Sequence, residues 1–206
     1  MGDFEEKIGL ELESIRGSGL WRELRCIESV QGSQIYYNGK KLINFSSNDY
    51  LGLAGHHTLT EAAKHAIDRF GVGSGASRLV CGSLEVHHEL EEALARWLKA
   101  EAALVFSSGF AAAQGVISSI VGSEDVVVID KKVHASTVDA VKLSGAKLRV
   151  FKHNDLSSLE KILKWADKRN SRVLTIAESV YSMDGDSPVI EDLVDLKERY
   201  GSWLML

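Results

Sequence analysis

The sequence is poor in the patterns that usually separate domains. It has one proline among 206 residues, Pro188, and it contains no Gly/Ser-rich linker, low-complexity tract or internal repeat. Linkers, disordered tracts and solenoids normally show such patterns. With 45% hydrophobic and 26% charged residues, the composition is instead typical of a globular protein that is large enough to bury a core.

Cysteine is also scarce. Cys26 and Cys81 form neither a disulfide framework nor a Cys-x-x-Cys pair. The sequence therefore predicts reduced, structural thiols and disfavours zinc or redox chemistry. The adjacent pairs His56-His57 and His87-His88 have no third ligand at a useful spacing, so no metal site is predicted.

Long apolar runs and basic clusters are absent too. No apolar run approaches the ~20 residues that span a bilayer, and the first six residues lack the basic start and apolar middle of a secretory signal. The 29 acidic and 24 basic residues give a net charge of −5, without the Lys/Arg-rich patch that binding to nucleic-acid phosphates requires. These absences predict a cytoplasmic protein with no membrane segment and no nucleic-acid partner.

The first 44 residues differ in pattern from the rest. Residues 4–25 are charged and weakly amphipathic, with a break at Gly17-Ser18-Gly19, and they predict a helical arm. Two short β-prone runs, 34–37 and 41–45, flank Asn38-Gly39, which is typical of a hairpin turn. We therefore expect an arm and a hairpin over residues 1–44, and a different domain from residue 45.

From residue 45 onward, helical patterns alternate with short, continuous apolar runs. In one helical segment Val86, Leu90 and Leu94 share a face. This alternation predicts an α/β fold with a mostly parallel sheet and helices on both faces. The predicted helices cover residues 58–70, 85–99, 111–121, 135–143, 156–169 and 191–200, and the predicted strands cover residues 102–106, 126–130, 148–151, 173–177 and 203–206.

The segment 106–112 is the first candidate site, because ligands of such sheets bind beyond the carboxyl ends of the strands. It joins an apolar run to an alanine-rich helix through Ser107, Ser108 and Gly109. A phosphate placed there would receive hydrogen bonds from the unpaired N–H groups of the helix N-terminus. Equally, Ser107 or Ser108 could do no more than cap the helix. The segment by itself leaves both interpretations open.

Two further strand ends carry polar residues. His134 follows one strand, and its imidazole could project into the mouth of the sheet, although a single histidine is more often a packed or solvated residue. The segment 178–186 lacks the spacing of a calcium loop. It is therefore either an ordinary Asp/Gly turn or a loop in which Glu178 and Ser182 face a ligand.

Residues 71–76 match the dinucleotide fingerprint Gly-x-Gly-x-x-Gly/Ala as letters only. That fingerprint requires a strand before it, whereas a predicted helix precedes it here. NAD binding is therefore disfavoured, and we interpret the glycines as a loop whose backbone passes close to a ligand or a neighbouring subunit.

Five segments, taken together, resemble the α-oxoamine synthases. These are residues 44–53, 73–80, 106–110, 134–136 and 182–186. Members of this family are pyridoxal-phosphate (PLP) enzymes that condense an amino acid with an acyl thioester and release CO2. The resemblance implies the large domain of the PLP-dependent transferase fold type I, PLP as cofactor and a homodimer.

The resemblance also implies roles for individual residues. In this family a Gly-Phe pair contacts the cofactor phosphate through its backbone, a histidine stacks on the pyridine ring, and a serine bonds near the phenolic oxygen. The implied cofactor-binding residues are Ser108, Gly109, Phe110, His134, Glu178 and Ser182.

The substrate contacts implied by the resemblance are Arg22 and His134. Arg22 matches the arginine that holds the substrate, with Arg25 as the alternative. His134 would help to orient the substrate carboxylate and is the candidate catalytic residue.

Within the family, Ser77-Arg78-Leu79 and the run 48–53 most resemble the member of biotin biosynthesis that joins L-alanine to a pimeloyl thioester, carried by CoA or acyl carrier protein. Two alternatives stay open. One is a glycine-using member of the 2-amino-3-ketobutyrate ligase or 5-aminolevulinate synthase type. The other is a short, non-catalytic binding module.

One part of the family pattern is not found in the 206 residues. In the family, an Asp-Glu-Ala-His run follows the strand that matches residues 203–206; its aspartate pairs with the pyridine nitrogen, and the Schiff-base lysine lies further on. The resemblance therefore implies that residues 45–206 are the first part of the PLP-binding domain. It also implies that catalysis belongs to the complete protein and that this chain alone is inactive.

Overall fold

The computed structural model describes residues 2–168 and 172–206. The chain divides into two compact units, Met1–Leu84 and Glu85–Leu206. A domain boundary near residue 44 stays a prediction.

The unit Met1–Leu84 contains a helix, a hairpin and a second helix. Helix α1 spans Gly2–Gly17 and ends at the predicted break, whereas residues 20–25 are not helical, so the prediction of a helical arm up to residue 25 is wrong there. The helix ends because Gly19 has a φ of 68°, the left-handed conformation that commonly terminates a helix.

The predicted hairpin is confirmed. Strands β1 (Gln34–Tyr37) and β2 (Lys40–Ile43) pair antiparallel, with Gln34 opposite Ile43. The two turn residues, Asn38 and Gly39, both have positive φ angles, of 49° and 67°, which is the backbone that a two-residue hairpin turn requires.

Helix α2 (His57–Phe70) precedes the glycine-rich residues 71–76, in agreement with the sequence-based expectation. A short π-helical turn, Arg78–Gly82, follows and is closed by a hydrogen bond from the Gly82 N–H to the Ser77 carbonyl (3.0 Å). A Cβ atom at Gly82 would lie 1.9 Å from the Ala76 carbonyl oxygen. Only glycine fits there, which the sequence did not reveal.

The unit Glu85–Leu206 is built around a parallel sheet of four strands in the order β4-β3-β5-β6. The predicted α/β class and the alternation of helix and strand are confirmed. The elements are α3 (Glu85–Leu98), α4 (Gly109–Ile120), β3 (Val126–Asp130), α5 (Ala135–Ser144), β4 (Lys147–Phe151), α6 (Leu156–Asp167), β5 (Val173–Ile176), α7 (Ile190–Tyr200) and β6 (Trp203–Met205). The predicted last residue of α6, residue 169, lies outside the described residues.

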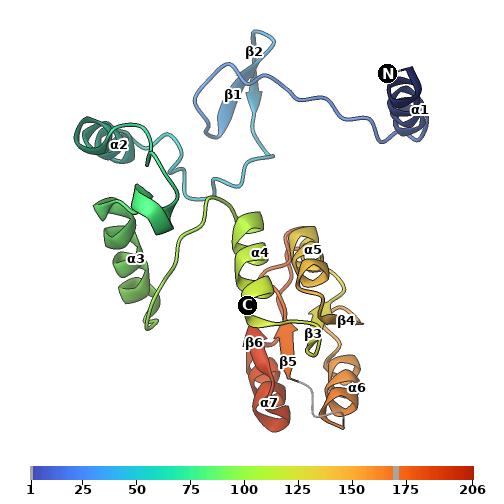
Figure 1. The fold of residues 1–206 in the computed structure, drawn as a ribbon. Helices are drawn as coiled ribbons and strands as arrows, with labels where there is room; N and C mark the ends of the chain where they lie inside the picture. Colours follow the sequence, from blue (N-terminus) through green and yellow to red (C-terminus); the bar gives the residue numbers. More distant parts are fainter. Residues whose placement is uncertain (1, 169–171) are drawn as a thin grey trace. The chain divides into compact units, whose positions relative to one another are not determined.

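Helices cover both faces of this sheet (Figure 1). Successive side chains of a strand point to opposite faces, so β3 contributes to two separate cores. Val127 and Ile129 pack with α4 and α5, while Val126 and Val128 pack with α6 and α7.

The strand order follows from the handedness of the connections. The chain leaves β3 through α5 to reach β4 on one side, and then returns through α6 to β5 on the other side of β3. Because parallel crossovers are right-handed, a reversal of direction requires a helix on the opposite face. The reversal makes the carboxyl end of β3 the switch point of the sheet, where ligands of such folds bind.

The predicted strand at residues 102–106 is wrong. The structure shows no strand there, although the Val105 N–H donates to Glu91 Oε1 (2.9 Å) and the Phe106 ring packs so closely on Gly115 that a Cβ atom there would lie 2.7 Å away. A strand requires a paired backbone, and no described strand pairs with this segment.

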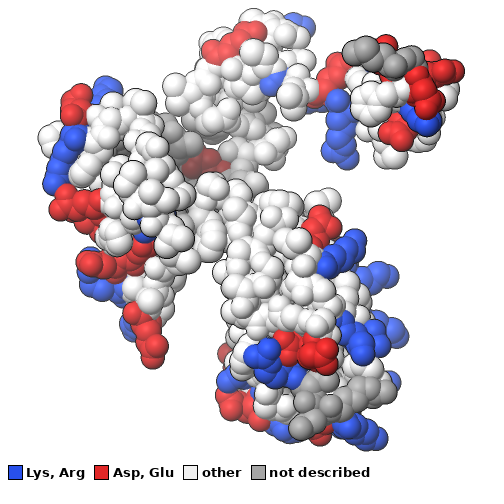
Figure 2. Space-filling view, viewed as in Figure 1, with Lys and Arg blue, Asp and Glu red and all other residues white. Residues whose placement is uncertain are grey.

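The two edges of the sheet differ. On the β4 side, Lys and Arg gather near α5 and β4 (Figure 2), and the Arg149 guanidinium lies 4.6 Å from the centre of the Trp165 ring. Charged side chains of this kind discourage edge-to-edge pairing. At the other edge, Trp203 of β6 is 45% exposed.

None of the helices in the described parts of the chain has the length and apolar character needed to cross a membrane.

Candidate functional site

Three strand ends meet at the carboxyl edge of the sheet. Strand β3 ends at Asp130, β4 is followed by His153 and Asn154, and β5 is followed by a loop from Glu178 to Asp186. In the sheet β3 lies between β4 and β5. The loop after β5 must therefore pass the end of β3 to reach the end of β4, and the hydrogen bonds show that it does.

Asp130 is the buried centre of this edge. Its side chain is fully buried, and its Oδ1 atom accepts from the Lys132 N–H (2.8 Å) and from His153 Nδ1 (2.9 Å). Its Oδ2 atom accepts from the Asn154 N–H (2.9 Å). A buried carboxylate is tolerated when such donors replace its hydration, and this one joins β3 to the end of β4.

His153 lies between two carboxylates. Its Nδ1 contacts Asp130, and its Nε2 lies 2.8 Å from Asp186 Oδ2. The hydrogen bond with Asp130, followed by that with Asp186, raises the pKa of the His153 imidazole, although partial burial opposes this effect. The ring also meets the edge of the Tyr181 ring, with 4.5 Å between the centroids. These contacts favour the imidazolium form.

Tyr181 anchors the loop from below. It is 1% exposed and belongs to the core that α4 and α5 share with the sheet. Its hydroxyl is buried, and burial raises the pKa of this phenol. Its N–H donates to the Asp186 carbonyl (2.9 Å), and its carbonyl accepts from the Gly185 N–H (2.7 Å). The loop is thus a turn held by two backbone hydrogen bonds of Tyr181, whose side chain is buried in the core.

His134 and Glu178, both predicted site residues, lie together. The His134 N–H donates to Glu178 Oε1 (2.6 Å). His134 also begins helix α5, where its Nδ1 accepts from the Ser136 N–H (3.2 Å) and lies 2.8 Å from the Ser136 hydroxyl. An accepting Nδ1 carries no proton, so the ring proton is on Nε2. The imidazole is exposed, and both its backbone and its ring orientation are held.

The N-terminus of α4 is the second part of the site. Ser108 caps this helix, because its side chain accepts from the Ala111 N–H (3.1 Å). The N–H groups of Gly109 and Phe110 have no partner among the described residues, and a Cβ atom at Gly109 would meet nothing within 4 Å. The segment therefore caps its own helix and still offers two free donors to an anion.

The chain path brings this helix end to the same edge. Helix α4 is followed by a tight turn, in which the Asp125 N–H donates to the Gly122 carbonyl (2.9 Å), and then by β3. The chain reverses in this turn, so α4 begins near the level at which β3 ends. The N-termini of α4 and α5 both lie at the carboxyl edge of the sheet.

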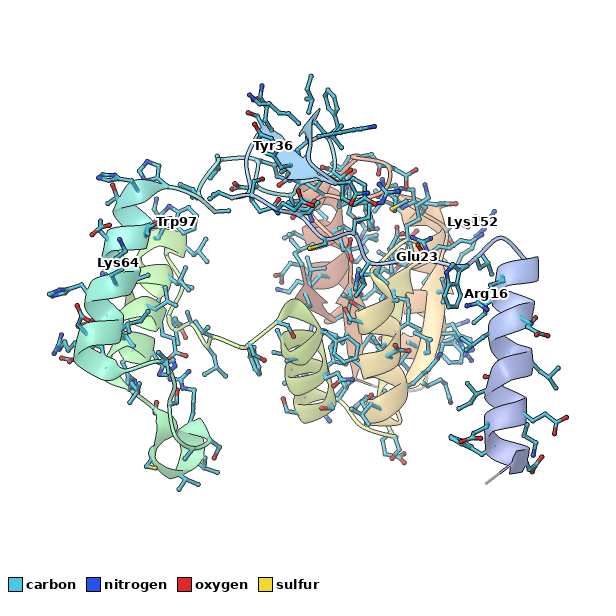
Figure 3. All side chains as sticks on the ribbon, turned by 90° about the horizontal axis from the view of Figure 1, so that it is seen from above. Arg16, Glu23, Tyr36, Lys64, Trp97 and Lys152 are labelled. Atoms are coloured by element: carbon cyan, nitrogen blue, oxygen red, sulfur yellow. The ribbon has the colours of Figure 1, made fainter. Side chains whose placement is uncertain are left out.

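Two predicted residues are less integrated. Ser182 is exposed within the turn after Tyr181, and no described hydrogen bond uses its hydroxyl. Arg22 lies in the other unit. Beside it, the Arg16 guanidinium lies 4.1 Å from the centre of the Trp21 ring, and Trp21 Nε1 donates to Glu23; Arg16 and Glu23 are labelled in Figure 3. Arg22 and Arg25 both line the same open pocket there. The roles of these residues stay predictions.

Sequence reasoning named the strand ends but missed the roles of Asp130, His153 and Asp186. The available signal was weak: a polar pair, His153-Asn154, follows a predicted strand after one intervening residue, Lys152 (labelled in Figure 3). The two partners of His153, Asp130 and Asp186, lie 23 and 33 positions away along the chain.

Within residues 2–168 and 172–206, no group of three or more His, Cys, Asp or Glu side chains could hold a metal ion.

Comparison with known proteins identifies a family. Residues 40–206 match the family model described as aminotransferase class I and II. Among curated proteins, the 8-amino-7-oxononanoate synthase of Geotalea daltonii is 45% identical over 98% of this chain and 51% of its own length. The namesake from Geobacter sulfurreducens is 47% identical over 95% of this chain and 50% of its own length. The chain thus spans about half the length of the curated relatives it matches.

Solved structures agree on the fold. A serine palmitoyltransferase from S. paucimobilis, with a bound PLP–myriocin aldimine, has a TM-score of 0.87 and 29% identity over 98% of this chain and 51% of that chain. The 8-amino-7-oxononanoate synthase of Francisella tularensis has a TM-score of 0.62 and 32% identity over 74% of this chain and 41% of that chain. Similarity of sequence and of fold therefore point in the same direction.

Proposed function

Because this chain belongs to the aminotransferase class I and II family, we propose that a complete protein containing it is a PLP-dependent acyltransferase. The proposed reaction condenses L-alanine with a pimeloyl thioester and releases CO2 and the free thiol of the acyl carrier, giving 8-amino-7-oxononanoate in biotin biosynthesis. The observation that carries this proposal is the identity of about 45% with 8-amino-7-oxononanoate synthases over nearly the whole chain.

The residues at the carboxyl edge fit PLP at two points. The free N–H groups of Gly109 and Phe110 suit a phosphate, and the open space at Gly109 leaves room for it. The exposed imidazole of His134 offers a ring face for an aromatic group, in an orientation that Ser136 holds. When bound, PLP supplies an electron sink for a carbanion at the α-carbon of the amino acid.

This chain's own residues would bind and orient. The N-terminus of α4, with Ser108, would neutralise part of the phosphate charge. Glu178 would fix the position of His134 by accepting a hydrogen bond from its backbone N–H. The Nε2–H of His134 could donate to a substrate carboxylate. Ser182 is exposed and free to bond the cofactor. Arg22 would pair with a carboxylate of the substrate.

We also infer that the complete protein is a homodimer. Leu79 and Val80, in the turn after the glycine-rich loop, are 96% and 77% exposed. Large apolar side chains of this kind are suited to a subunit contact. Sedimentation of the full-length protein as a stable dimer is expected, and a monomer at all concentrations would contradict the inference.

Two charge variants at opposite ends of α4 test the phosphate site. In the full-length protein, Gly109→Asp places a carboxylate where the phosphate would lie, and we expect PLP affinity to fall at least about tenfold, or ~1.4 kcal/mol. An acidic residue at a helix N-terminus does not destabilise the helix, so unfolding would not explain the loss. The matched control Ser118→Asp adds the same charge at an exposed position of the same helix and should leave PLP binding unchanged.

Activity assays then test the reaction. The wild type should form product from a pimeloyl thioester with L-alanine and much less with glycine, and His134→Ala should lower both turnover and PLP affinity. A preference for glycine would instead favour a glycine-using family member. Absence of PLP binding by the wild type would reject the enzyme proposal altogether.

A further inference from the structure

The loop from Glu178 to Asp186 is held by more than the proposed cofactor site needs. At its start Glu178 bonds the His134 backbone (2.6 Å), and at its end Asp186 contacts His153 Nε2 (2.8 Å) and accepts from Asn154 Nδ2 (2.9 Å). The loop thus touches the segments that follow β3 and β4, although it belongs to β5. A set of contacts that crosses two neighbouring strands can determine where the loop lies.

The contacts at the end of the loop form a chain of graded burial. The side chain of Asp130 is 0% exposed, that of His153 is 17% exposed and that of Asp186 is 44% exposed. These contacts therefore connect a fully buried group in the core with a partly exposed group on the loop. Charge-assisted hydrogen bonds of this length are among the stronger ones in proteins.

We propose that the Asp130–His153–Asp186 bridge is a positioning device, which holds the loop 178–186 over the end of β3 and thereby sets the place of the Glu178–His134 bond. Its relevance to catalysis rests on the proposed function of His134 and Glu178. Its effect on the loop does not. None of its three members needs to touch substrate or cofactor.

The bridge requires a protonated imidazole. Both ring nitrogens of His153 face carboxylate oxygens, and both contacts are hydrogen bonds only when each nitrogen carries a proton. The other groups around the ring are the neutral Tyr181 phenol and the Asn154 amide. Loss of a proton therefore leaves one bond, and the buried Asp130 has the greater need of it. The bond that opens is the one to Asp186.

The Lys132–Asp184 pair adds a second link from the same loop and a matched control. Its 2.8 Å contact is as short as that of Asp186, but both side chains are about two-fifths exposed, at 42% and 41%. Exposed pairs of this kind contribute little. Asp184→Asn and Asp186→Asn therefore remove the same charge from the same loop, and only the second removes the charged acceptor that faces His153.

Hydrogen–deuterium exchange of the full-length protein without added PLP tests the proposal. We expect Asp186→Asn to speed exchange at least about tenfold in a peptide covering 178–186 and at the His134 amide, while Asp184→Asn changes it less than about twofold. His153→Gln should speed exchange in the same peptide, but less than Asp186→Asn, which also weakens the Asn154–Asp186 contact; the double variant should add little to Asp186→Asn. A peptide from α7 serves as the internal reference.

The pH dependence of exchange in the loop distinguishes the proposed bridge from a contact that only stabilises the fold, which would not respond to the protonation of His153. After correction for intrinsic base catalysis, protection of the loop in the wild type should fall as the pH rises through the pKa of His153, and it should be flat with pH in Asp186→Asn. Equal effects of the two aspartate variants, or a flat wild-type profile, would overturn the proposal. So would a loosened loop with an unchanged His134 amide.

Failure of the proposed function has a different signature. If the wild type bound no PLP while the exchange pattern followed the expectation, the bridge would stand and the enzyme assignment would fall. If the wild type bound PLP and turned over but the loop ignored Asp186→Asn, the enzyme assignment would stand and the bridge would fall.

Discussion

The two units of this chain contain similar elements but differ in what those elements bury. Among the described residues 3–84 only Gly82 is buried, and apolar side chains such as Phe45 and Leu79 are 92% and 96% exposed. In the unit Glu85–Leu206, two apolar clusters cover both faces of the sheet. Helices and hairpins can thus be specified locally, whereas a core needs a second surface to pack against.

The difference also separates two ways of building a site. At the carboxyl edge of the sheet, His134 and Glu178 are held by hydrogen bonds anchored in a core. In the other unit, Arg22 lies on an extended segment that is stabilised by contacts among near neighbours. A site needs support from packed elements to be precise, and the described contacts beside Arg22 come only from near neighbours in the chain.

Core truncation should give the largest effect and the sharpest contrast. Ile117 of α4 is 0% exposed, and Ile117→Ala should lower the free energy of unfolding by about 2–5 kcal/mol through lost burial and a cavity. Phe45→Ala should change it by less than about 0.5 kcal/mol, because surface substitutions rarely matter. Denaturant unfolding of the full-length protein measures both. A large loss at Phe45 would break the comparison and show that its surface is covered there.

The Asp125–Arg172 pair should give an intermediate, pH-dependent effect. Asp125 is 3% exposed and receives two hydrogen bonds of 2.8 Å from Arg172, and this contact, more than the opposing burial, lowers the pKa of the Asp125 carboxyl. Asp125→Asn should cost about 1–3 kcal/mol at neutral pH.

The direction with pH follows from the lowered pKa. The stabilisation is complete above the ordinary pKa of an aspartate and is lost as the pH falls through the lowered pKa of the folded protein. Acid titration of stability should therefore be steeper in the wild type than in Asp125→Asn. If the free energy of unfolding changed with pH equally in both proteins, the Asp125–Arg172 pair would not contribute to the stability of the sheet as proposed.

The smallest effect on global stability is expected at the hairpin turn. Gly39 has a φ of 67°, so Gly39→Ala should strain the turn by about 1 kcal/mol. Because the hairpin lacks a buried core, the strain should speed hydrogen exchange over residues 34–43 and leave the global unfolding midpoint unchanged. A shifted midpoint would show that the hairpin is coupled to the rest of the protein.

Local pattern was sufficient for much of the fold. The strand predicted at 126–130 is β3 with the same bounds, and the helix predicted at 135–143 is α5 with one more residue. The prediction failed at residues 102–106, whose apolar run suits a strand but finds no partner in the described chain. A strand is a relation between segments, so composition alone does not decide it.

The candidate site could be predicted in part, because some of its residues flank predicted helices and strands. His134, Glu178 and Ser108 stand next to predicted strands or helices, where the fold class already places ligand-binding residues. Asp130 and His153 stand in equally suggestive places, but their meaning depends on which strands are neighbours. The burial of Tyr181 could not be predicted from the sequence either, because it depends on the path of the loop after β5.

Apart from residues 20–25 and 102–106, the amino-acid sequence by itself determined the succession of helices and strands, and it determined the Asn38-Gly39 turn, because periodicity and turn chemistry act between residues a few positions apart. Only the tertiary structure decided that β3 lies between β4 and β5 and that Asp130, His153 and Asp186 meet. Strand order results from the packing of helices on both faces, and residues far apart in the chain come together only when that packing is complete.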